Sequence, residues 1–146
     1  MTQRDLLRLE DYLIMGLRVS LGFIFFWFGA LKVAGYNPVF EIVYSTFPLL
    51  AQGTGNAALG IAEAVIGAAL LLSWFPLFIH ALLIFHLSGT FLAFFSAPEL
   101  MFDPYFPILT LSGEFVFKNA TLAIAGLVVL IHERKKRALF KTAPLA

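Results

Sequence analysis

The sequence predicts an all-α fold, a four-helix bundle integral to a membrane, and three observations predict it. Of the 146 residues, 60% are hydrophobic and only 13% are charged, whereas soluble domains carry roughly 25% charged residues. The mean hydropathy is +0.89. Four apolar stretches long enough to cross a bilayer take up most of the chain. We therefore expect residues 1–146 to form a single transmembrane domain with no separate soluble domain.

The four spans are expected approximately at residues 12–33, 56–74, 77–95 and 112–131. The first ends before residues 34–38, where glycine and proline disfavour a helix. Its apolar stretch is longer than a typical signal core and contains Arg18, which predicts a permanent helix rather than a cleaved signal peptide. Only residues 73–76 separate the second span from the third, so these two should be antiparallel neighbours.

Two longer connections join the remaining spans. Within residues 34–55, the segment 38–44 combines apolar and polar residues and could form a short helix lying in the membrane interface. An irregular packed loop is the alternative, and the sequence leaves both open. The other connection, residues 97–111, carries three prolines together with Glu99 and Asp103.

The positions of lysine and arginine predict the orientation. Arg4 and Arg8 precede the first span, four basic residues at 134–137 follow the fourth, and the two longer connections contain none. Because cytoplasmic flanks carry the excess of these residues, both termini should be cytoplasmic, which an even number of spans requires. The basic run would also meet anionic lipid headgroups.

Composition argues against several classes of function. A net charge of +1 gives no support for a nucleic-acid partner, and the absence of cysteine excludes thiol chemistry by the chain itself. The sequence contains no glycine-rich phosphate loop, metal-ligand quartet or nucleophile elbow. No independent catalysis is expected, and any redox chemistry needs a bound cofactor or a partner subunit.

Charged residues inside the spans are the informative ones, because each costs about 2.5–3.5 kcal/mol at the centre of a helix on insertion scales. The first span places Arg18 and Lys32 on one face with Gly22, Phe25 and Gly29. That face should point into the bundle.

The second span carries Glu63 on a small-residue face with Gly53, Gly60 and Gly67, which would allow another helix to approach closely. Glu63 either pairs with a basic residue to hold helices together or lines a ligand or proton site. The sequence does not separate these alternatives.

The third span contains His80 and His86, and the fourth begins with Glu114 and Lys118. The six-residue separation of the histidines turns them roughly 120° apart, so they should not share one metal ion. Each is a weak candidate for binding a cofactor, and a packing role is the alternative. Glu114 and Lys118 are either an ion pair at a helix start or members of a cluster that includes Lys32 and Glu63 beneath the outer connections.

These residues form a pattern that resembles the DoxX-like family of small four-helix inner-membrane proteins. The matching motifs are Arg18-x-x-x-Gly22-x-x-Phe25-x-x-x-Gly29-x-x-Lys32, then Gly60-x-x-Glu63-x-x-x-Gly67 followed by Leu70-Leu71-Leu72. Later segments are similar to the YkgB/RclC-type relatives: Ala97-Pro98-Glu99, Phe106-Pro107, and Leu111-Ser112-Gly113 leading to Lys118. The resemblance covers nearly all of the chain.

The resemblance implies a location in a bacterial inner membrane and association with a quinone-linked redox or stress-response system. The first hypothesis is therefore a non-catalytic accessory or quinone-binding subunit, with redox subunits as partners and a polar interior of Arg18, Lys32, Glu63, His86, Glu114 and Lys118. The second is a small transporter or channel for a proton, anion or small metabolite, working as a homo-oligomer. A purely structural assembly protein, in which the charges only lock the helices, is the third.

Overall fold

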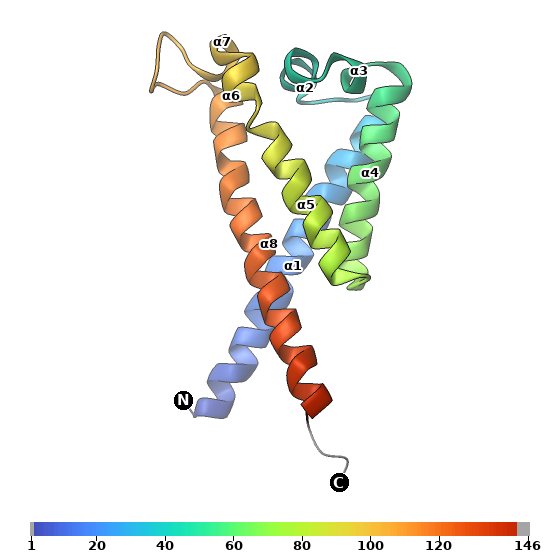
Figure 1. Cartoon of the computed structure of the whole chain (residues 1–146), viewed down its shortest axis with the longest axis vertical. Helices are drawn as coiled ribbons and strands as arrows, with labels where there is room; N and C mark the ends of the chain where they lie inside the picture. The colour runs from blue at the N-terminus through green and yellow to red at the C-terminus, as the bar shows by residue number, and fades with distance from the viewer. Residues whose placement is uncertain (1, 143–146) are drawn as a thin grey trace.

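The computed structural model describes residues 2–142 and is all-α (Figure 1). Its helices are α1 (Gln3–Val33), α2 (Phe40–Thr46), α3 (Pro48–Ala51), α4 (Gly53–Leu72), α5 (Pro76–Thr90), α6 (Ala93–Ser96), α7 (Pro98–Met101) and α8 (Leu111–Thr142). Four segments are long and apolar enough to cross a membrane: Gln3–Val33, Gly53–Leu72, Pro76–Ser96 and Leu111–Leu139. The expected multi-pass, four-span architecture is confirmed at this level.

The long helices are arranged with both ends of the described chain at one end of the bundle (Figure 1). The short helices α2, α3, α6 and α7 lie at the opposite end, where α2 and α3 belong to the first connection, α6 ends the third membrane-length segment and α7 begins the second connection. Helix α4 runs beside the upper part of α1, and α5 packs against α8. This arrangement agrees with the even number of spans, and the cytoplasmic placement of the termini remains a prediction.

Helices α1 and α8 are longer than the spans expected from hydropathy. Helix α1 begins at Gln3, because Thr2 and Asp5 form a capping box. The Asp5 amide donates to Thr2 Oγ1 at 3.3 Å, and the Thr2 amide donates to Asp5 Oδ2 at 2.9 Å. Helix α8 continues through the basic run to Thr142. Lys136 Nζ donates to Asp11 Oδ2 at 2.8 Å and so ties this extension to α1.

The third expected span is broken near its end. Helix α5 stops at Thr90, and α6 resumes at Ala93. The Thr90 hydroxyl donates to the Leu87 carbonyl at 2.6 Å and accepts from Asn119 Nδ2 at 2.9 Å. A side chain that bonds the preceding turn competes with regular helix bonding and bends a helix, which accounts for a break at this position.

The connection after α1 contains the short helix α2, as the first of the two alternatives for residues 38–44 predicts, and its position in the membrane interface stays a prediction. Phe40 and Tyr44 stack with ring centroids 5.5 Å apart on α2. Beneath the connections, a small core of Ile42, Ala93, Met101 and Val116 joins α2, α6 and α7 to α8. This core fixes the connections to the top of the bundle.

Glycines bring α1 and α4 together, and this is the most extensive helix pairing in the structure. A Cβ atom added to Gly60 would lie 2.7 Å from Lys32 Cβ, and one added to Gly22 would lie 2.9 Å from Leu71 Cγ. Cβ atoms on Gly29 and Gly67 would run into the backbone of the facing helix. The small-residue faces predicted on the first two spans therefore do pack against one another.

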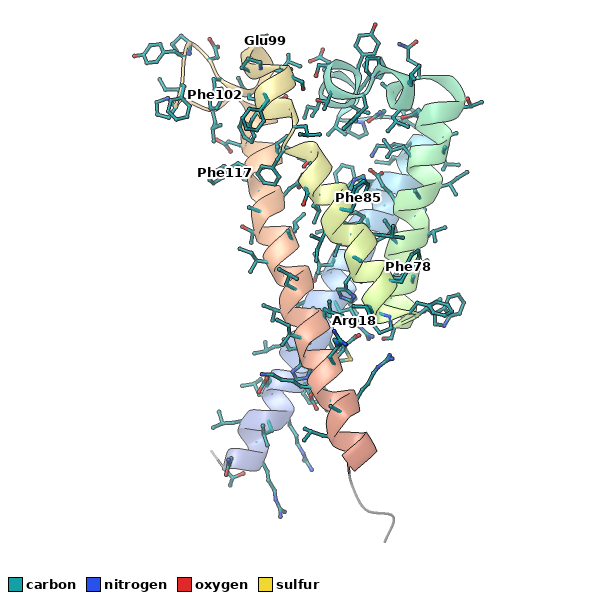
Figure 2. The ribbon with its side chains drawn as sticks, in the orientation of Figure 1. Arg18, Phe78, Phe85, Glu99, Phe102 and Phe117 are labelled. Carbon is teal, nitrogen blue, oxygen red and sulfur yellow. The ribbon has the colours of Figure 1, made fainter. Side chains whose placement is uncertain are left out.

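Large aromatic side chains cover the outside of the bundle. Phe78, Phe85 and Phe117, labelled in Figure 2, are each more than half exposed. In water this surface would be unfavourable, whereas lipid chains are as apolar as the side chains themselves. The four membrane-length helices therefore imply direct contact with a lipid bilayer.

Candidate functional site

Glu63 is the centre of a polar cluster within the bundle. Its Oε2 accepts a hydrogen bond from Lys32 Nζ at 2.6 Å, and its Oε1 lies 3.2 Å from His86 Nε2. Lys32 comes from α1, Glu63 from α4 and His86 from α5, so the cluster joins three of the four long helices. We call these three residues the Glu63 triad.

Local packing explains why the triad forms. Gly29 and Gly60 allow the backbones of α1 and α4 to approach until Lys32 Cβ lies over Gly60, which leaves the lysine side chain directed along α4 to Glu63. Lys32 is in the last turn of α1, where the helix dipole favours a positive charge. Its Nζ also lies 5.8 Å from the centroid of the Phe28 ring, within range of a cation–π interaction.

The members of the triad differ in accessibility. Lys32 and Glu63 are buried, at 3% and 5% exposed, whereas the side chain of His86 is 23% exposed. The edge of the His86 ring packs against Phe25 at a centroid distance of 5.4 Å. His86 is therefore the member that a ligand can reach, and it connects the surface of the bundle to the buried carboxylate.

An open depression of about 710 Å³ lies between the end of α1, α3 and the start of α4, and Lys32 contributes to its wall. Asn37 and Asn56 also line it: Asn37 Nδ2 donates to Asn56 Oδ1 at 2.8 Å, and Asn56 Nδ2 donates to the Lys32 carbonyl at 3.1 Å. Polar groups thus continue from the connections down to the triad.

Glu114 and Lys118 do not join this cluster. Lys118 Nζ donates to Glu114 Oε2 at 3.0 Å, and the two side chains are 72% and 51% exposed. The neighbouring Phe115 packs against Phe28 on α1 at 6.0 Å, so that face of α8 points inward and Glu114 points away from it. The expectation of one cluster with Lys32 and Glu63 is wrong for these two residues, and the alternative of a helix-start ion pair is confirmed.

Arg18 also lies apart from the triad. Its NH1 donates to Glu133 Oε1 on α8 at 3.3 Å, and both side chains are mostly buried. Sequence reasoning missed Glu133 because the fourth span was expected to end at residue 131. Figure 2 shows Arg18 near the crossing of α1 and α8, toward the end of the bundle that carries the termini.

A further group of polar contacts that sequence reasoning missed holds α1 to α8 below this pair. His132 Nε2 lies 2.9 Å from Asp11 Oδ1, and His132 Nδ1 lies 3.3 Å from Glu10 Oε1. The sequence signal for this contact is a pair of acidic residues near the start of the first span and basic residues after the fourth span, which could pair if the two helices cross.

The two histidines of α5 have separate surroundings. His80 is 1% exposed and its Nδ1 bonds the Pro76 carbonyl at 2.6 Å, whereas His86 bonds Glu63. Across residues 2–142, no group of three or more His, Asp or Glu side chains is arranged to hold a metal ion.

The arrangement at Glu63 suits hydrogen bonding and proton exchange. A carboxylate between an ammonium and an imidazole is held in place and can exchange a proton with the imidazole, which is a common proton carrier near neutral pH.

No protein-family model, curated protein or solved structure matches the chain.

Proposed function

We propose that this chain is a DoxX-like inner-membrane protein that acts as a non-catalytic accessory subunit of a bacterial redox or stress-response system and binds a quinone headgroup at the Glu63 triad. The observation that carries the proposal is a buried carboxylate fixed between Lys32 and the partly exposed His86. The redox setting comes from the family resemblance of the motifs around Arg18, Lys32 and Glu63, and redox subunits are the proposed partners.

The chemistry of a quinone headgroup fits this site. Its carbonyl oxygens accept hydrogen bonds, and Lys32 Nζ has N–H groups beyond the one that it donates to Glu63, whereas His86 Nε2 is already bonded to Glu63. Its flat ring requires apolar walls, which Phe25 supplies beside His86 and Phe28 supplies beside Lys32. Reduction of a quinone consumes protons, and the contact between His86 and Glu63 provides a pair of groups that can deliver them.

Quinone binding to the purified protein tests the proposal. The protein in nanodiscs is titrated with a short-chain ubiquinone analogue and a menaquinone analogue, and quenching of tryptophan fluorescence reports binding. His86→Leu should weaken binding at least tenfold, whereas the control Glu114→Gln, on the exposed ion pair, should bind like the parent. Equal affinity of the parent and His86→Leu, or no saturable binding by either, would overturn the proposal.

A second candidate function is transport of a proton or small ion by a homo-oligomer. The observation that favours it is the presence of ionisable groups at two depths, Arg18 with Glu133 toward the termini and the Glu63 triad toward the connections. Proton flux in liposomes that Glu63→Gln abolishes would support transport. Flux equal to that of empty liposomes would exclude it.

A further inference from the structure

A second polar site lies between α5 and α8, on the side of the bundle that carries the termini. The two helices are antiparallel, and two contacts fix their register. Asn119 bonds Thr90, and a Cβ atom added to Gly126 would lie 2.7 Å from Leu83 Cδ2. Because the helices run in opposite directions, a step from Leu83 back to His80 corresponds to a step from Gly126 forward to Val129, so His80 and Val129 are at the same level. Glu133 follows Val129 about one helical turn further along α8.

Helix geometry tilts the Cα–Cβ bonds of His80 and Glu133 toward each other's level along this interface. In an α-helix each Cα–Cβ bond tilts toward the N-terminus. Because α5 and α8 run in opposite directions, His80 tilts toward the level of Glu133 and Glu133 tilts toward the level of His80. The bond from His80 Nδ1 to the Pro76 carbonyl has the same direction.

Each of these residues has one buried atom that lacks a partner. A carbonyl only accepts, so the bond to Pro76 places a proton on His80 Nδ1 and leaves Nε2 of the neutral ring as an acceptor. Arg18 occupies Glu133 Oε1. Within residues 2–142, His80 Nε2 and Glu133 Oε2 are the buried side-chain atoms without a hydrogen-bond partner.

We propose that a single internal water molecule bridges His80 Nε2 and Glu133 Oε2 and donates one hydrogen to each. Two neighbouring acceptors cannot bond each other directly and need a donor, which a water molecule supplies; buried waters typically have two to four polar partners. A bound cation is disfavoured, because Arg18 already neutralises Glu133 and an additional buried charge would lack a counterion.

The site gives His80 a role that is independent of quinone binding. Through the water, His80 on α5 would be linked to the Arg18–Glu133 pair that joins α1 and α8. The site is separate from the triad, in which His86 Nε2 faces a carboxylate directly.

Nitrogen NMR of the full chain in nanodiscs, with ¹⁵N-labelled histidine, tests the water site. His80, assigned by loss of its signals in His80→Gln, should carry its proton on Nδ1. Its Nε2 resonance should be displaced by an accepted hydrogen bond and should show magnetisation transfer from water. His86 is the internal control, because it should carry its proton on Nε2.

Two results would overturn the proposal. One is an unbonded Nε2 with no transfer from water, which means a dry site. The other is a protonated Nε2 bonded directly to Glu133. In Glu133→Met the transfer from water should fall by at least half while the His86 signals stay unchanged. Full retention of the transfer in this variant, or in Arg18→Met/Glu133→Met if the single variant fails to fold with Arg18 left unpaired, would show that Glu133 does not hold the water.

Discussion

Replacing Glu63 by leucine should destabilise the bundle strongly. The substitution removes the acceptor 2.6 Å from Lys32 Nζ and leaves an ammonium buried among apolar side chains, since Lys32 is only 3% exposed. Removal of one partner of a buried ion pair costs about 3–5 kcal/mol. We expect the free energy of unfolding to fall by about 3 kcal/mol.

The assay is reversible unfolding in mixed detergent micelles with increasing SDS, followed by circular dichroism. The double variant Lys32→Met/Glu63→Leu removes both charges, so it should recover most of the lost stability. Glu114→Leu is the matched control: its ion pair with Lys118 is exposed, and exposed pairs contribute little. A Glu63→Leu variant as stable as the parent, or a double variant no more stable than Glu63→Leu alone, would refute the reasoning.

Three further predictions concern packing, the lower ion pair and orientation. Gly29→Val should lower the unfolding free energy by more than 2 kcal/mol, because the valine side chain would meet the α4 backbone. The control Gly16→Ala should have little effect, since nothing lies within 4 Å of a Cβ atom at that position. Equal SDS midpoints for the two variants would contradict this prediction. Arg18→Met should destabilise the protein less when it is combined with Glu133→Gln than additivity predicts, and strictly additive losses in the same assay would exclude their coupling. The chain contains no cysteine, so single cysteines can report its orientation. A cysteine at Gln52 should react with a membrane-impermeant thiol reagent in intact bacterial spheroplasts, whereas a cysteine in the first turn of α1 should react only after lysis. The reverse labelling pattern would show the opposite topology.

The fold could be predicted from the sequence because hydropathy locates the four membrane-length helices, and glycine and proline mark where the connections between them begin. The glycines of the first two spans, seven residues apart in each, predicted the faces that α1 and α4 use. The ends of α1 and α8 were missed because a capping box and contacts between α1 and α8 continue helices that hydropathy cannot detect. The break after Thr90 was missed because nothing local shows that the Thr90 hydroxyl bonds the preceding turn while it accepts from Asn119, a residue distant in sequence.

The candidate site could be predicted only in part. Lys32 and Glu63 lie on the small-residue faces that bring α1 and α4 together, so helical periodicity was enough to place them in the interior. Periodicity does not fix the rotation of one helix against another, which is why Glu114 and Lys118 were expected inside although they are exposed. The contact between His86 and Glu63 depends on the rotation of α5, and no local pattern encodes it.

Photolabelling with an azido-quinone tests the central claim most directly, because it asks where in the bundle a quinone binds. The protein in nanodiscs is labelled, digested and mapped by mass spectrometry, with excess unmodified quinone as competitor. The account predicts competable labelling confined to segments around the Glu63 triad, in the second half of α1, in α4 and near His86, with loss of the label in His86→Leu. Labelling spread over the outer phenylalanines, unaffected by competitor or by the His86 substitution, would contradict it.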